Sequence, residues 1–134
     1  MREILFKAKR KDNGKWIEGY YQKRYDLLGN EEHLIFHADS YNVWEYAEID
    51  PETVCQFTGL CDKNGKRIWE NDIIQYGAVA AVVKFGEYGN GNLGFYVDFP
   101  EETNYRKDFS YWAKKVVVIG NAVDDRSLLQ EVLE

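Results

Sequence analysis

The stretch Phe57–Ile74, FTGLCDKNGKRIWENDII, carries the strongest structural signal in the chain. At its centre, Asn64-Gly65 separates two apolar segments, and this pair is favoured in tight hairpin turns because both residues accept a positive φ at little cost. Glu70-Asn71-Asp72 then predicts a second bend, directly before the apolar Ile73-Ile74. We therefore expect a β-hairpin followed immediately by a further strand.

Similar short apolar segments, separated by Gly, Asn and Asp, run through the rest of the chain. They predict strands at Glu3–Lys9, Trp16–Tyr21, His33–Ala38, Val43–Ile49, Thr53–Leu60, Arg67–Trp69, Ile73–Tyr76, Val79–Phe85, Phe95–Phe99 and Val116–Ile119. Gly86–Gly94 is expected to be a flexible loop or hairpin tip, and Phe109–Lys115 fits a short helix or a strand. Only the tail, Ser127–Leu133, has helical spacing of its leucines.

This pattern predicts a mainly β fold, either a small barrel or a sandwich, with a short C-terminal helix. The bend and strand at Glu70–Tyr76 resemble the start of a strand in an SH3-like barrel. We expect one domain over residues 1–134, with a possible seam between two β lobes near Asp50–Thr53, because Pro51 cannot donate to a strand ladder.

Composition limits the possible partners. The 134 residues are 45% hydrophobic and 16% aromatic, and the formal net charge is −6. The densest basic run, Lys7–Lys11, is interpreted as the solvated end of the first strand, so direct nucleic-acid binding is disfavoured. With only Cys55 and Cys61, a charged N-terminus and no long apolar run, we expect reduced thiols, a cytoplasmic location and no membrane span.

The candidate catalytic and metal-binding groups have structural explanations. His33 and His37 share a strand-like segment, where residues four apart lie roughly 13 Å from each other, too far to bind one metal ion. Cys55 and Cys61 match no common metal or redox spacing. Four carboxylates could in principle do acid–base work but are expected to be solvated: Asp98, Glu101, Glu102 and Asp108. The glycine-rich segment Gly86–Gly94 is not followed by the Lys and Ser/Thr that a phosphate-binding loop needs. The sequence predicts no catalytic residue, metal site or cofactor.

Three segments nevertheless resemble a known family. Residues 57–74 are similar to the YopX signature, Q-[YF]-T-G-L-x-D-x-N-G-x-x-I-[YW]-E-G-D-I-[IV]. Arg2–Ala8 resembles the family's opening, and Val118–Asn121 with Leu128-Leu129 resembles its close. The resemblance implies a β-rich protein of phage or prophage origin, working in a bacterial cytoplasm, and it implies no reaction. Where the family has Gly, this chain has Asn71, the non-Gly residue that best tolerates a left-handed backbone.

The signature residues are interpreted as structural. They are Thr58, Gly59, Leu60, Asp62, Asn64, Gly65, Ile68, Trp69, Glu70 and Asp72 in the hairpin, and Gly120 and Asn121 in the closing motif.

For function, the aromatic content favours a non-enzymatic protein that acts through protein–protein association, as a homo-oligomer or with a host or phage protein. One alternative is an acidic inhibitor or mimic directed at a host nucleic-acid enzyme. Another is an SH3-like nucleic-acid-binding module with Lys7–Lys11, Lys63, Lys66 and Arg67 as phosphate contacts. An enzyme with an unrecognised site is the weakest alternative.

Overall fold

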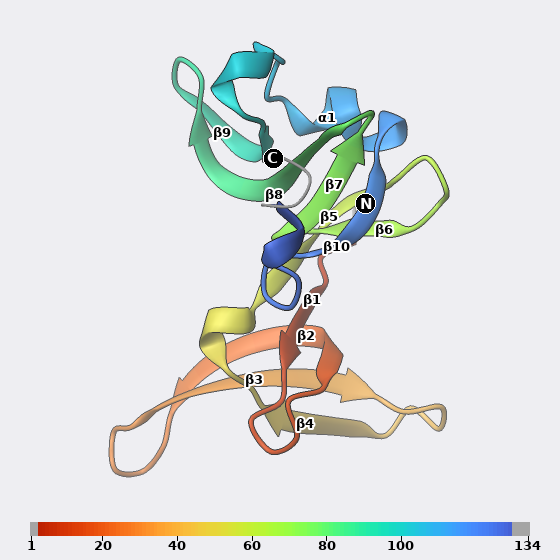
Figure 1. Ribbon diagram of the computed structural model, residues 1–134. Coiled ribbons are helices and arrows are strands. Elements are labelled where there is room, and N and C mark those ends of the chain that lie inside the picture. The colour runs from red at the N-terminus through yellow and green to blue at the C-terminus, as the bar shows by residue number, and fades with distance from the viewer. Residues whose placement is uncertain (1–2, 130–134) are drawn as a thin grey trace. The chain divides into compact units, whose positions relative to one another are not determined.

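The computed structural model describes residues 3–129, which form two compact units divided between Phe57 and Thr58 (Figure 1). Strands make up 53% of the structure, which confirms the mainly β prediction. They form two antiparallel sheets, and neither closes into a barrel within the described residues. The barrel and its SH3-like character therefore stay predictions. The expected seam, Asp50–Thr53, lies inside the first unit, where Pro51–Thr53 forms a short 3-10 helix, η1.

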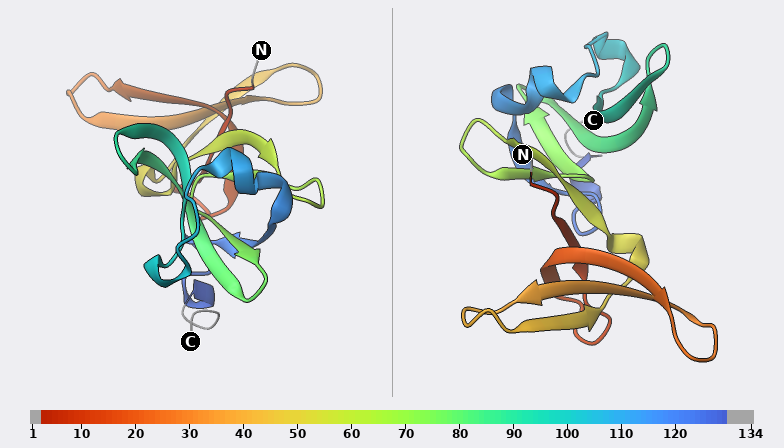
Figure 2. Two further views of the ribbon diagram at one scale, coloured as in Figure 1. Left: turned by 90° about the horizontal axis from the view of Figure 1, so that it is seen from above. Right: turned by 180° about the vertical axis from the view of Figure 1, so that it is seen from behind.

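The first unit is one antiparallel sheet. Its strands are β1 (Phe6–Lys9), β2 (Trp16–Tyr25), β3 (Glu31–Ala38), β4 (Trp44–Glu48) and the start of β5 (Cys55–Cys61). They lie in the order β4-β3-β2-β1-β5, so β4 is an edge strand (Figures 1 and 2). Short turns join β1 to β2, β2 to β3 and β3 to β4, as the Gly and Asn positions predict.

One face of this sheet carries the main apolar cluster of the unit, although Leu34, which is 2% exposed, lies on the other face. Ala8, Ile35 and Ile49 are fully buried, and Phe6, Ile17, Tyr21 and Val54 pack around them. In the register, Tyr21 lies opposite Ile35, which lies opposite Ala47. Because side chains alternate between the faces of a strand, the neighbouring residues Tyr20, Phe36 and Tyr46 project from the other face.

The second unit contains a four-stranded sheet in the order β10-β7-β8-β9. Its strands are β7 (Asp72–Tyr76), β8 (Val79–Tyr88), β9 (Asn92–Asp98) and β10 (Val117–Asn121), and the end of β5 pairs with β6 (Arg67–Trp69). Three short helical segments complete it: η2 (Glu101–Thr103), α1 (Phe109–Trp112) and η3 (Ala113–Lys115).

Both faces of this second sheet carry apolar side chains that are covered. On one face, Ile74, Val83 and Val97 pack with Phe109 and Trp112, which α1 presents to them. On the other, Ile73, Ala80 and Val82 pack with the segment after β10, including Leu128 and Leu129. This explains why Ile73-Ile74 and Val79–Val83 are continuous apolar runs rather than alternating ones.

The structure defines three segments that the sequence left ambiguous or without exact ends. The glycine-rich stretch Gly86–Gly94 is a hairpin tip, because β8 and β9 extend into it and leave only residues 89–91 between them. The ambiguous Phe109–Lys115 is helical. The predicted C-terminal helix begins at Ser127 and is helical through Leu129, and its remainder lies outside the described residues.

Gly19 provides a test of the close packing in the first unit. A Cβ atom built there would lie 2.2 Å from the Phe36 carbonyl oxygen and 2.9 Å from Ile35 Cγ2. Both neighbours belong to the paired strand β3, so neither can move away without disturbing the sheet.

We therefore expect Gly19→Ala to lower the free energy of unfolding by about 1–3 kcal/mol, as overpacking typically does. Chemical denaturation measures this, with the exposed Gln22→Ala on the same strand as the control, expected to change stability by less than about 0.5 kcal/mol. Equal stability of the two variants would contradict the packing described here.

Candidate functional site

The signature hairpin is organised by the side chain of Asp62, which is only 5% exposed. Its Oδ1 accepts hydrogen bonds from the backbone N–H groups of Asn64 and Lys66, both at 2.9 Å. The Asp62 N–H donates to the Lys66 carbonyl, and Gly65 takes the left-handed φ of 82° that completes the turn. The buried Asp62 side chain therefore stabilises the turn by accepting its backbone N–H groups.

The second carboxylate oxygen of Asp62 reaches a strand far along the chain. Oδ2 accepts the buried N–H of Val118 in β10 at 3.0 Å, and the adjacent Lys63 N–H donates to the Val116 carbonyl at 3.1 Å. Burial alone would raise the pKa of Asp62, but the N–H donors of Val118, Lys66 and Asn64 outweigh it and hold the pKa below its ordinary value. The carboxylate is thus held in its charged form as a structural acceptor.

The bend after the hairpin depends on two further signature positions. Asn71 has a φ of 71°, the left-handed conformation expected for the residue that replaces the family's Gly. Its N–H donates to the Val83 carbonyl and its carbonyl accepts from Ala122, both at 2.7 Å. Asp72 is 3% exposed and accepts the Trp69 N–H at 2.8 Å. The bend joins the hairpin to the sheet by these hydrogen bonds.

Gly120 and Asn121, which belong to the closing motif, also have a structural role. A Cβ atom at Gly120 would lie 2.8 Å from Asp125 Oδ2 and 2.9 Å from Leu128 Cδ1, so the glycine leaves room for the following segment. The Asn121 side-chain oxygen accepts the N–H groups of Val123 and Asp124, at 3.0 and 2.8 Å. Gly120 and Asn121 therefore shape the turn that leads from β10 to the C-terminal segment.

The histidines and cysteines are not brought together. His33 and His37 lie on the strand β3, where His33 is hydrogen-bonded to the Tyr21 hydroxyl and His37 faces Glu45. Cys55 is buried and donates to the Thr53 carbonyl, whereas Cys61 is half-buried, and neither forms a disulfide within the described residues. Across residues 3–129, no three His, Cys, Asp or Glu side chains are placed to hold one metal ion.

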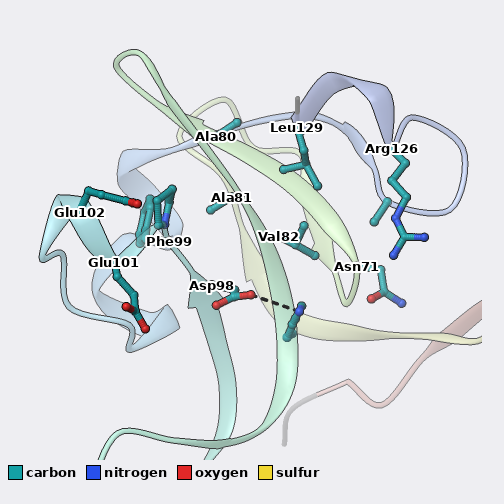
Figure 3. A pocket seen from close by; sticks show the side chains of 13 residues that line it. Asn71, Ala80, Ala81, Val82, Asp98, Phe99, Glu101, Glu102, Arg126 and Leu129 are labelled. Carbon is teal, nitrogen blue, oxygen red and sulfur yellow. Dashed lines mark ion pairs between the residues drawn. The ribbon is translucent and has the colours of Figure 1, made fainter. Parts of the chain in front are cut away.

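Three of the four candidate carboxylates border an open groove of about 630 Å³ in the second unit (Figure 3). Asp98 forms an ion pair with Lys84 at 3.1 Å, while Glu101 and Glu102 lie on the segment that follows β9. Apolar side chains, including Val82, line the floor. Because the ion pair is well exposed, water screens it, and it holds neither side chain firmly in place.

The fourth candidate, Asp108, lies away from this groove and binds Arg106 at 2.6 and 2.9 Å. The hydrogen bond from Arg106 lowers the pKa of Asp108 below its ordinary value. A carboxyl group that acts as a general acid near neutral pH needs the opposite shift. Asp108 is therefore suited to an ion pair rather than to proton transfer.

The first unit presents a different feature, which we call the aromatic face: Tyr20, Phe36, Trp44 and Tyr46. The register places Tyr20, Phe36 and Tyr46 side by side across β2, β3 and β4. The ring centroids of Tyr20 and Trp44 are 5.9 Å apart, and those of Phe36 and Tyr46 are 5.6 Å apart. Tyr20, Trp44 and Tyr46 are 54%, 56% and 57% exposed, which is unusual for rings that could pack in a core.

The aromatic face could not be found from the sequence alone. The alternation of Trp44 and Tyr46 is visible in the sequence and places both on one face of a strand. Their alignment with Tyr20 and Phe36, however, depends on the pairing register of three strands. A register shifted by one residue would turn these side chains toward the core.

The structure therefore defines a mainly β protein whose most distinctive motif is a hydrogen-bonded framework. None of the helices in the described part of the chain is long and apolar enough to cross a membrane. The family model described as YopX protein matches residues 5–130, and no curated protein matches the chain. The chain belongs to the YopX family.

The role of Asp62 leads to a prediction about stability and pH. Its pKa is lower in the folded protein than the ordinary value of 3.8, so its carboxylate stabilises the fold above about that pH. This contribution is lost as the pH falls through the folded-state pKa. We expect Asp62→Asn to reduce the free energy of unfolding at pH 7 by about 1–3 kcal/mol, because buried N–H groups lose a charged acceptor.

The difference between Asp62→Asn and the wild type should narrow in denaturation measurements as the pH falls below about 3.8, where Asp62 of the unfolded chain begins to bind a proton, and should continue to narrow as the pH approaches the lower pKa of the folded protein. Asp39→Asn is the control, because Asp39 accepts the N–H groups of Tyr41 and Val43 in an exposed turn. That substitution should cost less than about 0.5 kcal/mol. A difference between Asp62→Asn and wild type that is independent of pH would contradict this role.

Proposed function

We propose that this protein acts through protein–protein association rather than catalysis, and that its partner on the aromatic face is a second copy of the chain. The observation that carries the proposal is the exposure of Tyr20, Trp44 and Tyr46 beside one another on a single sheet face. Tyrosine and tryptophan are enriched in interfaces because they supply a large apolar area and a polar group together.

The edge position of β4 supports a second copy as the occupant of this face. Trp44 and Tyr46 lie on the outermost strand of the sheet, so a partner that pairs with this strand also continues the aromatic face. An exposed strand edge can pair with a strand from another molecule where its own chain leaves it open, which in β4 excludes the end at Glu48, and closed two-fold dimers are the commonest form of assembly.

Charges on the surface favour this proposal over an acidic mimic of nucleic acid. Carboxylates on the sheet of the first unit alternate with basic partners: Glu31 binds Lys23, Glu32 binds Arg24, and Glu48 binds Lys11. A mimic of nucleic acid presents a continuous field of one sign, which these ion pairs interrupt.

Nucleic-acid binding is also less favoured than association. Within the basic run Lys7–Lys11, Arg10 binds Asp12 at 2.9 Å and Lys11 binds Glu48 at 3.1 Å. A phosphate would have to displace these carboxylates to use the two cations. The family resemblance further supports our proposal that the protein is encoded by a phage or prophage and works in the cytoplasm of a bacterial host.

Size-exclusion chromatography with light scattering tests the association. We expect the wild type to have a mass of at least twice the 15.7 kDa of one chain. Tyr20→Ser with Trp44→Ser should weaken the assembly at least tenfold, because the loss of two aromatic anchors typically costs more than about 1.4 kcal/mol.

The matched control carries Phe85→Ser and Leu93→Ser, two residues of the second unit that are 51% and 75% exposed. It removes as many exposed apolar side chains outside the aromatic face and should assemble like the wild type. A wild-type protein that remains monomeric at high concentration would overturn the proposal.

A further inference from the structure

We propose that the second unit binds the phosphate group of a nucleotide in an open hollow between Lys63, Tyr76 and Lys115. A free nucleotide and a nucleotide within a single strand present the same phosphate and base, so both are included. This inference goes beyond the proposed function, because it concerns a different surface and a different kind of ligand. It depends on how the fold places the two lysines, on the charge that they leave available, and on the ring beside them.

Three segments of the second unit meet at this hollow, which has a volume of about 350 Å³. Sites that hold small molecules typically measure about 300–1,000 Å³, so a nucleotide phosphate with part of its base fits here. The segments are the signature hairpin, the end of β7 with the turn that follows it, and the junction of η3 with β10. The lining residues are Lys63, Gln75, Tyr76, Gly77, Lys115 and Val117.

The framework around Asp62 brings the two lysines together. Lys63 follows Asp62, and its N–H donates to the Val116 carbonyl at 3.1 Å, which places it beside Lys115. The register pairs the first residue of β10 with the residue before Tyr76, so Tyr76 lies at the same end of the sheet. The backbone of the site is therefore fixed by the hydrogen bonds of the fold, and only the lysine side chains must adjust to a ligand.

The two lysines keep their charge available. Neither Lys63 nor Lys115 forms an ion pair with another residue within 3–129, and the Lys115 Nζ lies 4.5 Å from the centre of the Tyr111 ring, a cation–π contact that orients it. The lining residues include no carboxylate. Asp62, beside Lys63, is buried, and both of its oxygens accept backbone N–H groups. An anion in the hollow would therefore meet two cations and no opposing charge from the lining.

This hollow differs in that respect from the basic run of the first unit. There, Arg10 and Lys11 are bound to carboxylates of their own chain, which a phosphate would have to displace. Lys63, which the sequence also suggests as a phosphate contact, has no such partner within the described residues. The argument against the run Lys7–Lys11 therefore does not apply to the hollow.

The lining favours a phosphate that carries a base over a simple carboxylate. The Gln75 Nε2 donates to the Gly77 carbonyl at 3.0 Å, so this acceptor is already engaged. Two ammonium groups act as separate point charges, which suits the several oxygens of a phosphate, whereas a planar carboxylate is matched best by an arginine fork. The Tyr76 ring is 40% exposed, and Trp112, at 4.9 Å between centroids, keeps it in place as a surface on which a base can stack.

Fluorescence anisotropy with the full chain tests the site. The two probes are a fluorescent nucleoside monophosphate and a labelled short oligothymidylate strand, both titrated at low salt. We expect at least one of them to bind, and we expect Lys63→Gln combined with Lys115→Gln to weaken that binding by roughly tenfold or more, because two charged donors are lost.

Two further variants separate the site from net charge and from folding. Lys11→Gln with Lys15→Gln removes the same charge from exposed positions of the first unit and should change binding by less than about twofold. Lys63→Arg with Lys115→Arg keeps both charges and should retain most of the binding. Circular dichroism would confirm that all three double variants fold.

Salt dependence provides a readout that a purely structural role would not change. Each phosphate contact with a single strand contributes about 0.7 to the slope of log affinity against log salt concentration. If the strand binds, Lys63→Gln with Lys115→Gln should therefore reduce that slope by about 1.4, whereas the Lys11 and Lys15 control should leave it unchanged.

The outcomes decide both the site and the source of the phosphate. Binding of the monophosphate alone would identify a free nucleotide, and binding of the strand would identify nucleic acid. Binding of neither probe, equal affinity for a polyglutamate peptide, or an equal loss in the Lys11 and Lys15 control would overturn the inference. The aromatic face lies in the first unit, so the Lys63 and Lys115 variants should keep the assembled mass of the wild type, and failure here would leave self-association standing.

Discussion

The carboxylate of Asp62 is the contact on which the second unit depends. One of its oxygens holds the hairpin turn through Asn64 and Lys66, and the other holds β10 through Val118. A single buried charge therefore joins segments 56 residues apart in the chain. Because three backbone N–H groups surround it, its desolvation is compensated, and an uncharged residue of similar size would leave those donors without an equivalent acceptor.

The rest of the signature extends this framework. Asn71 connects the bend to β8 and to the segment after β10, and Asp72 closes the bend by accepting the Trp69 N–H. Gly120 then allows Asp125 and Leu128 to approach β10. These contacts give several polar groups of the motif, including Asp62, Asn71 and Asp72, a structural role in holding the chain together.

The two units differ in how their sheets are covered, and this difference directs the functional interpretation. The four-stranded sheet carries packed apolar clusters that include Ile74 on one side and Ile73 on the other. The sheet of the first unit packs Ile35 on one side, while on the other side Leu34 is buried but Tyr20, Trp44 and Tyr46 remain exposed. The association that we propose rests on these exposed aromatic rings at the outer strand of the sheet.

The sequence by itself determined the local structure of this protein. Period-two alternation, Gly and Asn turns and the Asn64-Gly65 signal located the strands and the signature hairpin, because these depend on backbone preferences within a few residues. The division between Phe57 and Thr58, the bond from Asp62 to Val118 and the alignment of Tyr20 with Phe36 and Tyr46 came only from the tertiary structure. Each depends on strand order and register, which long-range packing decides, and the same local pattern is compatible with several pairings.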